Sequence, residues 1–122
     1  MNVKNKKVLI IEDEKVLQNT YCRILKSKFN YEIDLAGSAE TGLEFFSKKN
    51  YDFIITDLDL PGMNGIELIK KIKSKKPEIK IIVISGYGFS TLIEKAIKYG
   101  AEEFLSKPVD IHKFRNTVAK YI

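Results

Sequence analysis

The chain has 122 residues, of which 44% are hydrophobic and 30% are charged, and its net charge is +5 at pH 7. This length and composition favour one globular domain with a sizeable core, so we expect residues 1–122 to form a single domain. Cys22 is the only cysteine, which excludes an internal disulfide and a thiolate zinc site. No apolar run reaches the length of a membrane span or a signal-peptide core. The expected location is therefore the cytoplasm, with no membrane partner.

Short apolar and β-branched runs predict strands along the chain. They cover residues 8–12, 32–35, 53–57, 80–85 and 103–106. The first, third and fourth runs are almost continuously apolar, which is typical of parallel strands covered on both faces.

The segments between these runs repeat apolar residues at helical spacing. One face of the first segment carries Leu17, Tyr21, Ile24 and Leu25, one face of the third carries Ile66, Ile69 and Ile72, and one face of the last carries Phe114, Val118 and Tyr121. Ser38 and Asp110 are suited to cap helix amino ends, and Gly100 is suited to end a helix. Alternating strands and helices predict an α/β fold, a doubly wound parallel sheet with helices on both faces.

Polar side chains stand where four of the predicted strands end. These are Glu12 and Asp13 after the first strand, Asp57 at the end of the third, Ser85 at the end of the fourth and Lys107 after the fifth. The carboxyl ends of parallel strands meet at one edge of a sheet, where ligands bind near the point at which the strand order reverses. We therefore expect these five side chains to lie in one crevice.

Such a crevice can bind a metal ion and a phosphoryl group. Three neighbouring carboxylates need a compensating charge, which a hard cation with oxygen ligands such as Mg²⁺ supplies. A carboxylate beside a metal can act as a nucleophile and form an aspartyl phosphate. Lys107 and Ser85 can meet phosphoryl oxygens, and Gly86 lets a backbone N–H approach a ligand closely.

Together these motifs resemble the receiver domain of two-component response regulators, from Lys7 to Ile122. The matching motifs are the Glu12-Asp13 pair, TDLDLPGMNG at residues 56–65, ISG at 84–86 and FLSKP at 104–108. The resemblance implies a flavodoxin-like, chemotaxis-regulator-like fold with a five-stranded parallel sheet in the order 2-1-3-4-5.

The resemblance also implies a role for each site residue. Asp57 would accept the phosphoryl group, and Ser85 and Lys107 would contact its oxygens. The Mg²⁺ ligands would be Glu12, Asp13, Asp57 and the backbone carbonyl of Asp59.

Phe104 occupies the switch aromatic position of the family, coupled to Ser85. Because phenylalanine has no hydroxyl to place in solvent, we expect its ring to favour a buried pocket beside Ser85. The resemblance further implies a cis Lys107-Pro108 peptide bond, which is uncommon outside such constrained sites.

The sequence contains no nucleotide-binding glycine motif, so the phosphoryl group must come from another molecule. The resemblance implies a sensor histidine kinase or a histidine phosphotransfer protein as donor, and an output protein whose identity the sequence does not give. It implies a phosphoacceptor signalling domain that catalyses only its own phosphorylation and slow dephosphorylation, and is not otherwise an enzyme. The sequence is compatible with a stand-alone receiver and with part of a longer chain.

A phosphatase of the haloacid dehalogenase type is an alternative from another class. Its aspartate pair resembles Asp57 and Asp59 in the run IITDLDL, with Asp57 as nucleophile and Asp59 as acid. Those enzymes carry the pair on their first strand and need a substrate-covering cap, whereas here the pair lies mid-chain before a short loop. The phosphatase would also leave Glu12 and Asp13 unexplained.

The net charge of +5 suggests nucleic-acid binding as a third possibility. Only Arg23 and Arg115 among the 21 basic residues are arginines, and no DNA-binding motif accompanies the lysines. Many lysines follow predicted helices, where a cation complements the helix dipole. We therefore expect no specific nucleic-acid binding.

Overall fold

The computed structural model describes residues 6–86 and 90–121. The strands are β1 (Lys6–Ile11), β2 (Tyr31–Ala36), β3 (Phe53–Asp57), β4 (Lys80–Ser85) and β5 (Glu103–Ser106). The helices are α1 (Lys15–Lys28), α2 (Ala39–Lys48), α3 (Gly65–Lys75), α4 (Ser90–Lys98) and α5 (Ile111–Ala119). The last three strands have the predicted bounds, and the first two differ from the prediction by one or two residues at each end.

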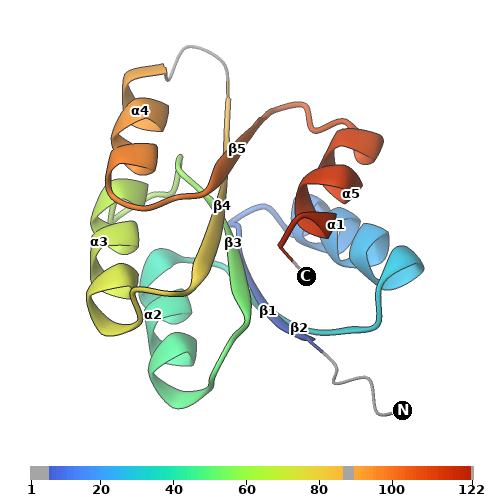
Figure 1. The fold of residues 1–122 in the computed structure, drawn as a ribbon, viewed down its shortest axis with the longest axis horizontal. Helices are drawn as coiled ribbons and strands as arrows, with labels where there is room; N and C mark the ends of the chain where they lie inside the picture. The colour runs from blue at the N-terminus through green and yellow to red at the C-terminus, as the bar shows by residue number, and fades with distance from the viewer. Residues whose placement is uncertain (1–5, 87–89, 122) are drawn as a thin grey trace.

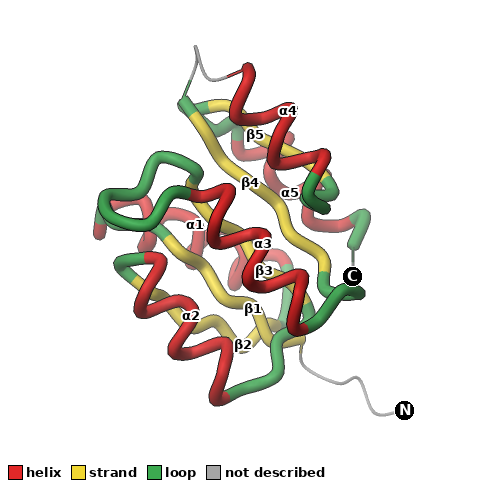
Figure 2. Tube along the Cα trace, turned by 90° about the vertical axis from the view of Figure 1, so that its left-hand side faces the viewer, coloured by secondary structure: helices red, strands yellow, loops and turns green. Residues whose placement is uncertain are grey.

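The strands form one parallel sheet with the order β2-β1-β3-β4-β5. Helices α1 and α5 cover one face of this sheet, and α2, α3 and α4 cover the other (Figure 1). Figure 2 shows the second group of helices in front of the strands. The predicted doubly wound fold is confirmed, and the strand order reverses between β1 and β3, where the predicted site lies.

Two hydrophobic clusters, one on each face of the sheet, hold these layers together. Leu9 and Ile11 of β1 pack in the cluster beneath α2, α3 and α4, whereas Val8 and Ile10 pack in the cluster beneath α1 and α5. This alternation follows from the two-residue period of a strand. The predicted apolar faces of α1, α3 and α5 all contribute to these clusters.

Side-chain caps fix where the helices begin. Ser38 Oγ accepts from the Thr41 N–H at 3.0 Å, and Asp110 Oδ1 accepts from the Lys113 N–H at 2.9 Å, as the sequence predicts. Gly100, with a φ of 119°, follows α4 in the left-handed conformation that favours glycine. No helix in the described part of the chain is long and apolar enough to cross a membrane.

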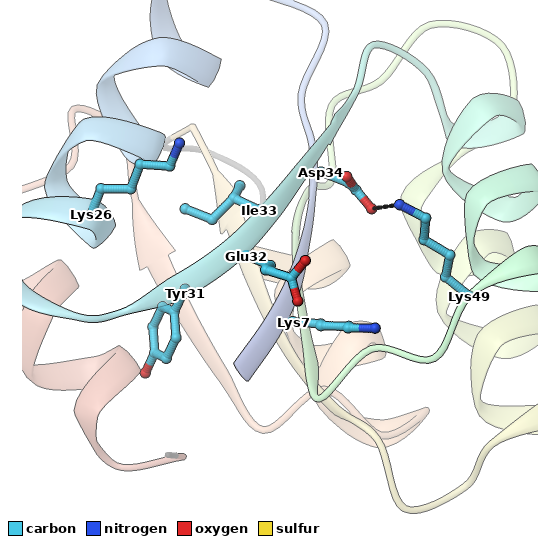
Figure 3. A pocket seen from close by; sticks show the side chains of 7 residues that line it. All are labelled: Lys7, Lys26, Tyr31, Glu32, Ile33, Asp34 and Lys49. Atoms are coloured by element: carbon cyan, nitrogen blue, oxygen red, sulfur yellow. Dashed lines mark hydrogen bonds and ion pairs between the residues drawn. The ribbon is translucent and has the colours of Figure 1, made fainter. Parts of the chain in front are cut away.

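The carboxylate of Asp34 on the edge strand β2 contacts the segment just before β3. Asp34 Oδ2 accepts from the Tyr51 hydroxyl at 2.6 Å. It also accepts from Lys49 Nζ at 3.1 Å (Figure 3). The Tyr51 hydrogen bond, followed by that of Lys49, outweighs partial burial and lowers the pKa of Asp34 below its usual 3.8. This contact therefore stabilises the fold more strongly when Asp34 is ionised than when it is protonated.

We predict that Tyr51→Phe lowers the free energy of unfolding near pH 7 by about 1 kcal/mol, because Asp34 loses a hydrogen bond but stays partly hydrated. Because folding lowers the pKa of Asp34, the ionised carboxylate contributes its full stability above pH 3.8. This contribution is lost as the pH falls through the pKa of Asp34 in the folded protein. The difference between the two proteins in urea titrations should therefore shrink progressively as the pH falls below 3.8. An equal difference near pH 7 and below pH 3.8 would contradict the assignment.

Gly65, the first residue of α3, allows this helix to approach the end of β3. A Cβ atom at this position would lie 2.8 Å from Leu58 Cα, and backbone atoms cannot move aside cheaply. Leu58 itself is held by its N–H, which donates to the Ile84 carbonyl at 2.9 Å. The glycine thus keeps α3 close to the strand that carries Asp57.

We predict that Gly65→Ala lowers the free energy of unfolding by about 1–3 kcal/mol, because the added methyl group overpacks this contact. Urea unfolding measures the change. Gly37→Ala is the matched control, since the nearest atom to its added Cβ is Gln18 Nε2 at 3.8 Å. The control should keep or slightly raise stability, and equal losses in both variants would refute the packing argument.

Candidate functional site

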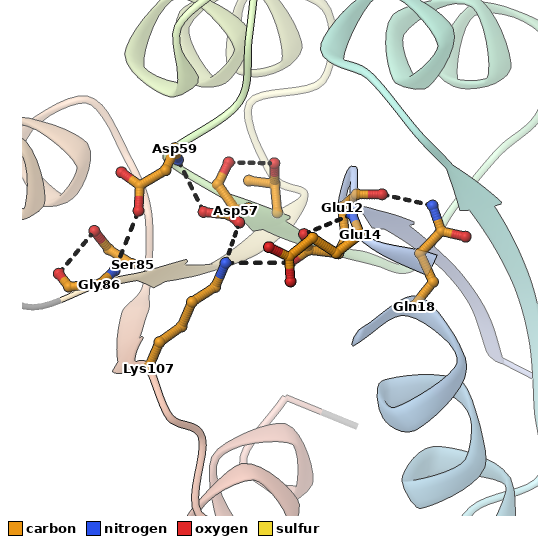
Figure 4. A network of polar contacts seen from close by, with 9 residues as sticks. Glu12, Glu14, Gln18, Asp57, Asp59, Ser85, Gly86 and Lys107 are labelled. Atoms are coloured by element: carbon orange, nitrogen blue, oxygen red, sulfur yellow. Dashed lines mark hydrogen bonds and ion pairs between the residues drawn. The ribbon is translucent and has the colours of Figure 1, made fainter. Parts of the chain in front are cut away.

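The carboxylates predicted to converge do so at the carboxyl edge of the sheet. Glu12 and Asp13 follow β1 and Asp57 ends β3, and one carboxylate oxygen of each lies within 4.8 Å of the others. Lys107, just after β5, brings its ammonium to the same place (Figure 4). Residues 95 positions apart in the chain therefore meet, counting from Glu12 to Lys107 (107 − 12).

Asp57 lies at the centre of the cluster and is only 2% exposed. Its Oδ2 accepts from Lys107 Nζ at 2.5 Å, and its Oδ1 accepts from the Asp59 N–H at 2.8 Å. Partial burial alone would lower the pKa of Lys107, but the hydrogen bond and charge of Asp57 outweigh it and raise that pKa. The ammonium is thus firmly charged and covers one oxygen of the carboxylate.

Glu12 is the second buried carboxylate of the cluster, with 1% exposure. Burial raises its pKa to about 7, and the charge of Asp57 acts in the same direction, against a hydrogen bond from the Glu14 N–H and the charge of Lys107. Its Oε1 lies 3.5 Å from Lys107 Nζ and accepts no hydrogen bond in the described structure. One ammonium therefore does not satisfy both buried carboxylates.

The cluster fits a small divalent cation. Its ligands would be oxygens, two of the carboxylates are buried, and the exposed Asp13 lies within reach of both. Mg²⁺ prefers this kind of site, with few carboxylates and room for water. An ion there would also meet the Glu12 oxygen that lacks a hydrogen-bond partner.

The ends of β4 and β5 complete the site. Ser85 is fully buried, and its hydroxyl donates to the Gly86 carbonyl at 3.3 Å. The Lys107 N–H donates to the Ser85 carbonyl at 2.8 Å, so the two strand ends are fastened to each other. The expected cis Lys107-Pro108 peptide bond is present.

The expectation of a buried Phe104 ring is wrong for this structure. Phe104 is 42% exposed, whereas Leu105 beside it on β5 is 1% exposed. Phe104 pairs in register with Val83, and Ser106 pairs with Ser85. Phe104 therefore lies on the same face of the sheet as Ser85 but is displaced from it by two residues along the strand. Because β5 is the last strand of the sheet, no further strand covers the outer side of the ring.

Sequence reasoning missed two supporting contacts. The buried Gln18 of α1 donates through Nε2 to the Glu12 carbonyl at 2.5 Å. The receiver resemblance implies a role only for the backbone carbonyl of Asp59, but its side chain accepts from the Gly86 N–H through Oδ2 at 3.2 Å. A glutamine on the otherwise apolar face of α1 was a signal for the first contact. No signal in the sequence identified the second.

Comparison with known proteins assigns the family. The sequence model described as "Response regulator receiver domain" matches residues 8–119. The chain therefore belongs to the response regulator receiver family, and the resemblance noted in its motifs is confirmed. Its acidic pocket of Glu12, Asp13 and Asp57 is that of a phosphoacceptor signalling domain in two-component signal transduction.

Two curated relatives from Bacillus subtilis differ in length. The chain is 30% identical over 118 residues to "Sporulation initiation phosphotransferase F", covering 97% of this chain and 94% of the relative. It is 32% identical over 119 residues to "Uncharacterized transcriptional regulatory protein YesN", covering 95% of this chain but only 32% of that protein. The chain thus matches nearly all of one relative and about a third of the other.

Solved structures agree with the fold. The CheY-like receiver domain protein from Methanospirillum hungatei superposes with a TM-score of 0.90 at 26% identity, covering 96% of this chain and 93% of that one. A receiver domain protein from Clostridium thermocellum gives 0.85 at 28% identity, with 94% and 95% covered. The family assignment and the position of Asp57 on the third strand both argue against the dehalogenase-type phosphatase.

Proposed function

We propose that this chain accepts a phosphoryl group on Asp57 from a phosphohistidine of a sensor histidine kinase or a histidine phosphotransfer protein. Transfer would change the conformation of the domain and so signal to an output partner. The observation that carries the proposal is the geometry around Asp57, a buried carboxylate between an ammonium at 2.5 Å and two further carboxylates. The relative named as a phosphotransferase, 94% of whose length is matched, supports it.

Each residue of the site has a separate role in the transfer of the phosphoryl group. Asp57 attacks the phosphorus atom, the P–N bond of the phosphohistidine breaks, and its electron pair returns to the imidazole ring. Lys107 leaves its position over Asp57 Oδ2 and contacts the oxygens of the transferred phosphoryl group. The hydroxyl of Ser85 contacts these oxygens too. The Asp59 N–H, 2.8 Å from Asp57 Oδ1, holds the carboxylate in orientation during the attack.

Glu12, Asp13, Asp57 and the backbone carbonyl of Asp59 would hold Mg²⁺ at this site. When bound, Mg²⁺ neutralises the negative charge that builds up as the phosphoryl group approaches three carboxylates.

Phe104 and Ser85 would carry the signal away from the site. The ring of Phe104 has apolar area to bury, and space beside Ser85 opens if a phosphoryl group draws the Ser85 hydroxyl towards Asp57. The ring would then move inward from its exposed position. This movement alters the surface formed by β5, where an output protein could detect it.

We also propose that residues 1–122 form one receiver domain and that it acts in the cytoplasm, where histidine kinases present their phosphohistidine. The basic charge needs no specific nucleic-acid partner. Lys26 and Lys28 lie in the last turn of α1, and Lys73 and Lys75 in that of α3, as helix dipoles favour.

Incubation with Mg²⁺ and phosphoramidate, a small donor with the same P–N bond, should give one acid-stable, alkali-labile acyl phosphate per chain. We predict that Asp57→Asn abolishes it, because the amide oxygen is a much weaker nucleophile. Intact-protein mass spectrometry measures the product. Asp52→Asn, at the opposite edge of the sheet, is the control and should remain phosphorylated. Repeated turnover of phosphate esters that Asp59→Asn abolishes would instead support the phosphatase.

Mg²⁺ binding should respond in opposite ways to two substitutions. We predict that Asp13→Asn weakens Mg²⁺ binding by about tenfold or more, because it removes a carboxylate ligand. Lys107→Ala should not weaken it, because the ammonium repels the cation, yet it should impair phosphorylation. Calorimetric titration with Mg²⁺ measures both effects. Weaker Mg²⁺ binding in Lys107→Ala would contradict the assignment of Lys107 to the phosphoryl group.

A further inference from the structure

The carboxylate of Asp59 connects two parts of the site. Its Oδ2 accepts from the Gly86 N–H at 3.2 Å, while its own N–H donates to Asp57 Oδ1 at 2.8 Å. Figure 4 shows Asp59 between Asp57 on one side and the Ser85-Gly86 segment on the other. One residue therefore contacts both the proposed phosphoacceptor and the carboxyl end of β4.

The hydrogen-bond donors at the end of β4 are engaged within the protein. The Gly86 N–H donates to Asp59, and the Ser85 hydroxyl donates to the Gly86 carbonyl at 3.3 Å. Both donors lie at the carboxyl end of β4. This strand pairs with β3, and Asp57 lies opposite Ile84. A phosphoryl group on Asp57 presents three acceptor oxygens to this strand end. It can use these donors only if they leave their present acceptors.

We propose that the Asp59 carboxylate is a competing acceptor that opposes phosphorylation of Asp57 by holding the Gly86 N–H. This inference rests on the proposed function, since it concerns the phosphorylated state of Asp57. When the phosphoryl group is present, the Gly86 N–H exchanges Asp59 Oδ2 for a phosphoryl oxygen. No covalent bond of Asp59 changes, so Asp59 is a positioning residue.

The exchange is favoured by charge and by the exposure of Asp59. A phosphoryl group on Asp57 places negative charge close to the Asp59 carboxylate, and the two like charges repel each other. Asp59 is only partly buried, so its carboxylate can turn to water at little cost, unlike the buried Asp57. The contact therefore stabilises the unphosphorylated state and is given up in the phosphorylated one.

The test compares three variants with the wild type at saturating Mg²⁺, using beryllofluoride as the probe for the phosphoryl group. Asp59→Ala removes the acceptor, whereas Asp59→Asn removes the charge but keeps an acceptor oxygen. Asp52→Ala is the matched control, because Asp52 Oδ2 accepts from the Lys7 N–H at 2.8 Å at the far edge of the sheet. We expect beryllofluoride to bind about fivefold more tightly to Asp59→Ala than to wild type. Asp59→Asn should be intermediate and Asp52→Ala unchanged.

The amide proton of Gly86 provides a readout without metal or probe. In the free protein its NMR resonance should move upfield in Asp59→Ala, because the hydrogen bond to a carboxylate is lost, and should not move in Asp52→Ala. An unmoved Gly86 resonance in Asp59→Ala would overturn the inference, as would unchanged beryllofluoride affinity.

Two further outcomes separate this inference from the proposed function. Equal tightening in Asp59→Ala and Asp59→Asn would show an effect of charge alone and would overturn the competing-acceptor role, while leaving Asp57 as phosphoacceptor. Failure of beryllofluoride to bind the wild type would instead contradict the proposed function, and the inference would fall with it.

Discussion

Two buried carboxylates share one ammonium in this molecule, and the chemistry of the site depends on that imbalance. Glu12 and Asp57 are 1% and 2% exposed, and Lys107 bonds to Asp57 while remaining 3.5 Å from Glu12. The exposed Asp13 adds a third carboxylate. Burying a carboxylate is costly unless its charge is fully compensated, and the same burial raises the pKa of Glu12. A divalent cation lowers this cost, so the site is suited to gather positive charge before an anionic phosphoryl group arrives.

The parallel sheet makes this cluster possible. Strands β1, β3 and β4 are almost completely buried between the helix layers, which lets their carboxyl ends be polar while their interiors stay apolar. Gly65 brings α3 close to Leu58 just after β3, and the N–H of Leu58 bonds to β4. The backbone around Asp57 is thus fixed from two sides. Rigid placement of the acceptor allows the flexible Lys107 to be the part that moves.

The doubly wound α/β class and the convergence of the site could be predicted from strand periodicity, whereas the strand order 2-1-3-4-5 came from the family resemblance. Asp57, Ser85 and Lys107 could be located because each follows a recognisable apolar run. The Asp59 side chain could not, since its contact with Gly86 depends on the path of a loop that has no periodic pattern. The exposure of an aromatic ring on the edge strand β5 depends on what covers its outer side, and no further strand of the sheet lies there. The outward ring of Phe104 was therefore mispredicted.

A crystal structure with Mg²⁺ and beryllofluoride tests the central claim most directly. The account predicts beryllium bonded to a carboxylate oxygen of Asp57. It places Mg²⁺ among Glu12, Asp13 and Asp57, with Lys107 moved from Asp57 Oδ2 to the fluorines. Beryllofluoride bound to another residue, or Mg²⁺ bound away from these carboxylates while Lys107 stays on Asp57, would contradict it.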